Sequence, residues 1–88
     1  MKDRLAKPAI QPDRLGDIMR ELFCADHEDE AVTILVDLTD AELAAVRIDA
    51  EENLADSILN DETDAASFFG YLRALADSAI WSRRLLVN

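Results

Sequence analysis

The chain has 88 residues and a formal net charge of −10, with nineteen Asp and Glu against nine Lys and Arg. This length suits one small domain, and half of the residues are apolar, so the chain can bury a core. The acidic balance disfavours direct binding to nucleic acid and to anionic membranes, and no apolar run approaches the roughly 20 residues that a membrane span needs.

Turn-forming residues and cysteine are scarce. The chain has two Gly and two Pro, and both prolines precede residue 13. Because all-β folds need turn residues throughout, this composition favours helices. The single Cys24 cannot form an internal disulfide, and the charged first residues lack the apolar core of a secretory signal, so we expect a cytoplasmic protein.

The first predicted helix follows a flexible N-terminal arm. Residues 1–11 have no consistent apolar period, and we expect a single helical domain over 12–88. Pro12 suits the first turn of a helix, and the spacing of the apolar residues after it predicts a helix over 12–25. These residues lie at i, i+3, i+4, i+7 and i+8: Leu15, Ile18, Met19, Leu22 and Phe23.

The next segment allows two interpretations. β-Branched residues are frequent over 32–36 and suit a strand, whereas the acids that precede this segment favour the start of a helix. A lone strand would have no partner in this chain. We therefore predict a short helix over 29–38.

The clearest local signal is a capping box. Thr39 can accept a hydrogen bond from the backbone N–H of Glu42, whose side chain can reach back to the N–H of Thr39. This predicts a helix over 39–60. Five polar residues then interrupt the apolar pattern, and a last helix is predicted over 64–86. The predicted fold is all-α, a small bundle of three to four helices.

The acids form a candidate recognition surface. Residues 21–64 carry fifteen Asp and Glu against the single Arg47. Acids spaced by seven fall on one face of the third helix, where the helix itself supplies no cation. This acidic face comprises Glu42, Asp49, Glu52 and Asp56, and we add Glu28, Asp29 and Glu30 from the preceding segment. The face is either an ordinary solvated surface or a binding site for a basic protein, and we expect its neutralisation to leave folding intact.

The last helix carries more apolar residues than one face needs. Its main arc suffices for a core, and a second apolar stripe comprises Tyr71, Ala74, Trp81 and Leu85. Either this helix is central and buried all round, or the stripe is an association surface, because Trp and Tyr are common anchors of interfaces. We expect the second, and with it a homodimer.

Chemical motifs are weak. The acids from Asp26 onward match part of a calcium-loop spacing, but Ala31 stands where the loop needs Gly. Cys24 and His27 lack a third catalytic or metal-binding member. We therefore expect no metal, no cofactor and no enzymatic activity.

These observations predict a small acidic interaction module that binds and regulates or inhibits a basic partner. One mechanism is DNA mimicry, in which carboxylates take the place of phosphates. The alternative is a dimerisation module that works through the second stripe of the last helix.

Overall fold

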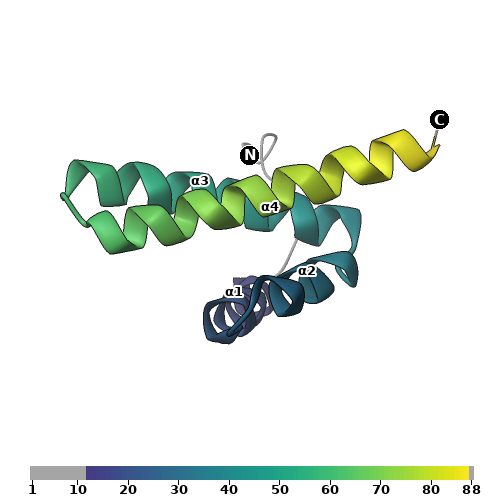
Figure 1. Ribbon diagram of the computed structural model, residues 1–88, viewed down its shortest axis with the longest axis horizontal. Helices are drawn as coiled ribbons and strands as arrows, with labels where there is room; N and C mark the ends of the chain where they lie inside the picture. Colours follow the sequence, from purple (N-terminus) through teal and green to yellow (C-terminus); the bar gives the residue numbers. More distant parts are fainter. Residues whose placement is uncertain (1–11, 88) are drawn as a thin grey trace.

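The computed structural model describes residues 12–87, which form four helices and no strand. The helices are α1 (Pro12–Cys24), α2 (Glu28–Val36), α3 (Asp40–Leu59) and α4 (Thr63–Val87) (Figure 1). The predicted all-helical fold is confirmed, and every predicted helix end lies within two residues of the observed one. The N-terminal arm expected over 1–11 lies outside the described residues.

A tight turn makes α3 and α4 an antiparallel hairpin. Asp61 adopts a left-handed conformation, with φ 59°. The N–H of Asp61 donates to the Ile58 carbonyl at 3.2 Å, and the N–H of Glu62 donates to the Ser57 carbonyl at 2.8 Å. This pair of bonds is a Schellman motif, which satisfies the last carbonyls of α3 and reverses the chain within three residues.

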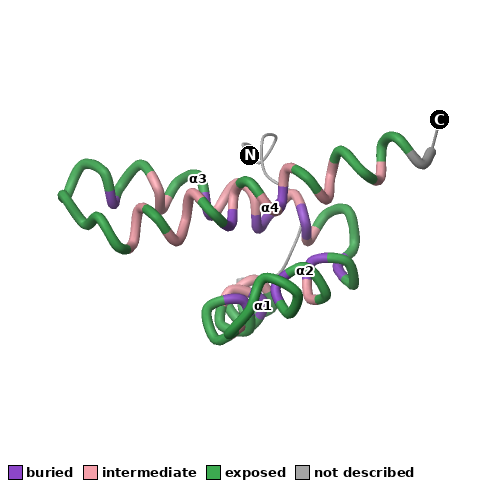
Figure 2. The backbone as a smooth tube through the Cα atoms, viewed as in Figure 1, coloured by how far each residue is buried: buried purple, intermediate pink, exposed green. Residues whose placement is uncertain are grey.

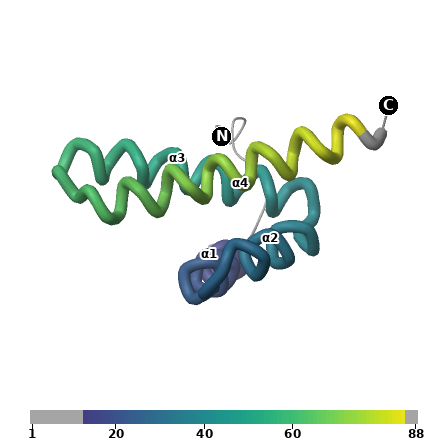
Figure 3. The backbone as a smooth tube through the Cα atoms, viewed as in Figure 1, coloured from purple at the N-terminus to yellow at the C-terminus, as the bar shows by residue number. Residues whose placement is uncertain are grey.

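The shorter helices α1 and α2 lie on one side of this hairpin (Figure 3). Most contacts between helices are those of α3 with α4, while α1 packs on α2 and α3, and α2 reaches α4. The buried positions gather where the four helices meet (Figure 2). The largest fully buried side chains are Ile18, Leu22, Leu35, Leu43, Val46 and Leu72.

Segment 32–36 is helical, as the acidic lead-in indicated. Glu28, Asp29 and Glu30 occupy the first turn of α2, where acids interact favourably with the helix dipole. Ala31 and Leu35 are buried one turn apart, whereas Val36 on the outer side is 62% exposed. The exposed β-branched residues explain why the sequence pattern also suited a strand.

Three large apolar residues, among them Phe23 of the predicted apolar face of the first helix, are exposed. Ile58 and Leu59 are 62% and 83% exposed because the last turn of α3 extends beyond α1 and α2 (Figure 1). Phe23 is 70% exposed, although its ring packs edge-on against Phe68 with ring centroids 5.2 Å apart. The core is therefore smaller than the apolar pattern predicted.

Candidate functional site

The face of α4 that points away from the other helices carries the second apolar stripe. Tyr71, Trp81 and Leu85 are 40%, 61% and 67% exposed, and Ala74 is exposed as well. On the opposite face, Leu72 and Ala76 are completely buried. The helix is thus not buried all round, and within a single chain the stripe is a solvent-facing surface.

Ser78 belongs to the same surface and was missed in the sequence analysis because only apolar residues were considered. Ser78 is exposed and lies between Ala74 and Trp81. With Ser78 included, the residues of this surface follow one another at steps of three, four, three and four along α4. This is the heptad pattern of helices that pack along one another. We call the surface the outer seam; it comprises Tyr71, Ala74, Ser78, Trp81 and Leu85. Its two central residues are small and its outer residues are large.

An open groove of about 970 Å³ adjoins the outer seam between the start of α3 and the end of α4. Trp81 belongs to both surfaces. Apolar residues line the groove together with three arginines and two aspartates: Asp40, Leu43, Ala44, Arg47, Ile48, Asp77, Ile80, Arg83 and Arg84. Two of the arginines already have partners, because Arg47 pairs with Asp77 and Glu51, and Arg83 pairs with Asp40. Arg84 is exposed and in no ion pair within residues 12–87.

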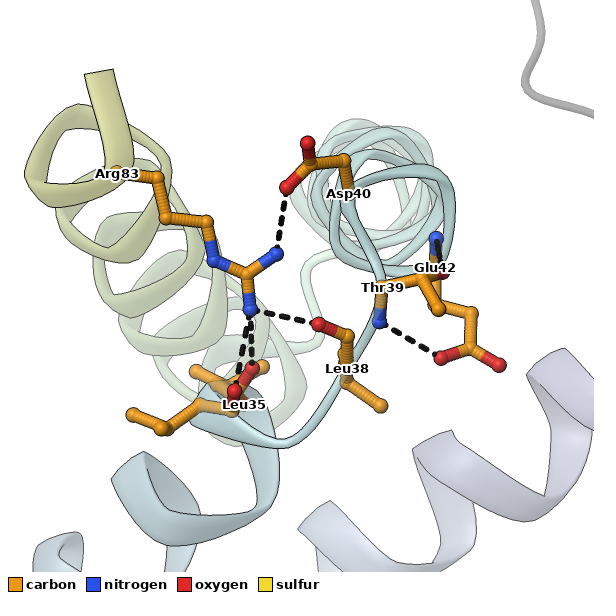
Figure 4. Close-up of polar contacts among 7 residues, drawn as sticks. Leu35, Leu38, Thr39, Asp40, Glu42 and Arg83 are labelled. Carbon is orange, nitrogen blue, oxygen red and sulfur yellow. Dashed lines mark hydrogen bonds and ion pairs between the residues drawn. The ribbon is translucent and has the colours of Figure 1, made fainter. Parts of the chain in front are cut away.

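Arg83 fastens the end of α2 to α4 (Figure 4). One terminal nitrogen, Nη1, donates to Asp40 Oδ1 at 2.7 Å. The other, Nη2, donates to the carbonyls of Leu38 at 2.6 Å, Val36 at 3.2 Å and Leu35 at 3.4 Å. A cation at this position satisfies carbonyls that have no partner within α2 and opposes the negative end of its dipole.

Glu42 in the acidic face has a structural role. Its side chain accepts from the Thr39 N–H at 2.9 Å, and its own N–H donates to Thr39 Oγ1 at 3.1 Å, so the predicted capping box is confirmed. Its other oxygen accepts from Arg14 Nε at 3.0 Å, from α1. These hydrogen bonds, with the Thr39 backbone first and Arg14 second, lower the pKa of Glu42.

We expected neutralisation of the acidic face to leave folding intact because α3 supplies no cation on that face; for Glu42 this premise is wrong, because α1 supplies Arg14. Asp49 is also engaged, since its carboxylate accepts from Asn53 at 3.1 Å. Glu52 and Asp56 are exposed. The four acids share a helix face, but they do not form one free row of carboxylates.

The acids of α2 are a separate group. Glu28, Asp29 and Glu30 are exposed, and Glu30 accepts a hydrogen bond from the Asp26 N–H at 2.7 Å. Within residues 12–87, neither Glu28 nor Asp29 forms an ion pair, and the same holds for Asp56.

Residues 12–87 contain no group of three or more His, Cys, Asp and Glu that could hold a metal ion. None of the helices in this range is both long enough and apolar enough to span a membrane. Searches against protein families, curated proteins and solved structures found no match to this chain.

Proposed function

We propose that this protein is a non-enzymatic interaction module whose working surface is the outer seam. One observation carries the proposal: Trp81 and Leu85 are 61% and 67% exposed on a helix whose opposite face holds the completely buried Leu72 and Ala76. Burying apolar side chains is favourable by about 25 cal/mol for each Å² removed from water. Aromatic side chains contribute most at the centres of interfaces, so Trp81 is the expected anchor.

The test is site-specific photo-cross-linking in the cells that make the protein. A photoreactive phenylalanine analogue replaces Trp81 in one variant and Val36 in a control variant. Val36 is a suitable control because it is 62% exposed, like Trp81, but lies on α2 away from the outer seam. We expect a defined adduct from position 81 and none from position 36. An equal yield of adducts from both positions, or no adduct at all, would refute the proposal.

A second candidate function is binding of a basic protein through the exposed acids, including by DNA mimicry. The observation that favours it is that three acids of the predicted recognition surface, Glu28, Asp29 and Asp56, are exposed and form no ion pair within residues 12–87. Fixed carboxylates attract Lys and Arg over distances of about a Debye length, which accelerates association.

Matched charge variants test this second function. One variant changes Glu28, Asp29 and Asp56 to their amides, and the control changes three acids of α1, Asp13, Asp17 and Glu21, in the same way. Both variants have the same net charge. The readout is displacement of duplex DNA from a lysine-rich histone-tail peptide. If the acids act as a defined surface, only the first variant loses displacement, whereas equal losses would mean that only net charge matters.

A further inference from the structure

We propose that the partner of the outer seam is a second copy of this chain, packed antiparallel along α4. This inference rests on the proposed function of the outer seam and adds the identity of the partner and its orientation. Three observations support it: the heptad spacing of the outer seam, the distribution of large and small residues along it, and the opposite charges at the two ends of α4.

The heptad spacing fixes the register. With Tyr71, Ser78 and Leu85 at the first apolar position of each heptad, Ala74 and Trp81 take the second. In an antiparallel pair, first positions lie level with second positions of the other helix. Tyr71 then lies level with Trp81 of the second copy, and Ala74 lies level with Ser78 of the second copy.

This register matches the sizes of the residues. The two central layers contain only Ala74 and Ser78, whose small side chains allow the helix backbones to approach closely. On either side, Tyr71 and Trp81 of the other copy form an aromatic pair, which prefers an edge-on or offset arrangement. The register gives four layers, and their order is the same whether they are followed along one copy or along the other. A two-fold axis that relates the two copies requires this symmetry.

The charges favour the antiparallel orientation. α4 begins with the acids Asp61, Glu62 and Asp64 at or just before its first turn and ends with Arg83 and Arg84. Arg84 lies one helical turn, about 6 Å along the axis, from the level of Asp64 of the second copy. Both residues are exposed, and a long arginine side chain covers such a distance. A parallel pair would instead bring Arg84 beside Arg84 and Asp64 beside Asp64.

The first experiment measures self-association of the full chain. Sedimentation equilibrium from low to high micromolar concentration follows the mass, and Trp81, the only tryptophan, reports the interface by its fluorescence. We expect a dimer, with a blue-shifted emission as the dimer forms. Trp81→Ala should weaken dimerisation at least tenfold. The control Leu59→Ala removes an even more exposed side chain outside the outer seam and should not weaken it.

Cysteine pairing determines the orientation. In a Cys24→Ser background, Ala74→Cys and Ser78→Cys are made as separate variants, oxidised alone and as a mixture. An antiparallel dimer places position 74 level with position 78 of the other copy, so the mixture should form the mixed disulfide, and neither variant should dimerise covalently by itself. In a parallel dimer each position would lie level with the same position of the other copy, so each variant would form a disulfide by itself. The mixed disulfide would then not form, because residues four apart on facing helices exceed the reach of a disulfide.

Each outcome has a definite meaning. Disulfides between identical positions would overturn the antiparallel inference. A monomer at high micromolar concentration would overturn the second copy as the partner. In that case, an adduct of another mass from the photoreactive residue at position 81 would leave the proposed function standing, whereas the absence of any adduct would remove both.

Discussion

At the scale of single residues, Glu42 links two parts of the fold. It caps the first turn of α3 through Thr39 and holds α1 through Arg14. Both contacts are stronger with the charged carboxylate, which lowers its pKa. A lowered pKa in the folded state means that the folded protein binds this proton less readily than the unfolded chain does. Glu42 therefore contributes stability at neutral pH that is lost in acid.

The variant Glu42→Gln tests this contribution. Gln can still accept the hydrogen bond from Thr39, but it loses the ion pair with Arg14. We expect the variant to be less stable than the wild type at pH 7. The difference should shrink as the pH falls through about 4.3, the pKa at which an unfolded Glu is half protonated, and vanish below the lowered folded pKa. Urea denaturation at pH 7, 5, 4 and 3 measures it, and a difference that is independent of pH would contradict the assignment.

At the scale of the helices, the position of α2 depends on a side chain from α4. Arg83 is separated from the end of α2 by more than forty residues, yet it donates to three carbonyls there and to Asp40. Its removal leaves the Leu38 and Val36 carbonyls without this donor, whereas the Leu35 carbonyl still accepts from the Leu38 N–H at 3.2 Å. The attachment of α2 should therefore be sensitive to this one residue.

We expect Arg83→Gln to lower the free energy of unfolding by about 1.5 to 3 kcal/mol, the range for hydrogen bonds to a charged group. The matched control is Arg20→Gln, which removes the same charge from an exposed pair with Asp17 on α1. The control should change stability by less than about 0.5 kcal/mol. Urea unfolding followed by circular dichroism compares the two, and equal losses would show that only the change in charge matters.

The sequence predicted local features better than contacts between helices. Thr39 with Glu42 marked the start of α3 because a capping box depends only on residues three apart. Arg14 and Arg83 could not be assigned partners, since these partners lie 28 and 43 residues away. The exposure of Leu59 depends on how far α1 and α2 extend, and that of Trp81 depends on which face of α4 the other helices cover. No helical period encodes either.

At the scale of the whole molecule, charge is unevenly compensated. The chain has nineteen acids and nine Lys and Arg. Within residues 12–87, four arginines form ion pairs with acids: Arg14, Arg20, Arg47 and Arg83. Most of the acids in this range have no part in these ion pairs. Compaction therefore brings like charges together and costs free energy.

We expect added salt to stabilise the fold, because it screens this repulsion more than it weakens the few ion pairs. The melting temperature should rise between low salt and about 0.3 M NaCl. At this concentration the Debye length is shorter than the roughly 10 Å found at 0.1 M, so exposed charges interact only with close neighbours. Trp81→Ala is the appropriate background, since any effect of salt on dimerisation is then removed. A melting temperature that falls with salt would mean that the ion pairs outweigh the repulsion.

The hairpin of α3 and α4 has a consequence for local unfolding. The two helices contact each other along α3, whereas α1 and α2 are attached at one side by fewer contacts (Figure 1). Such an arrangement divides the chain into cooperative units of different stability. Release of α1 and α2 would expose Ile18, Leu22 and Leu35 to water but leave the turn at Asp61 and the outward-pointing face of α4 in place. The outer seam can therefore persist in a partially opened molecule.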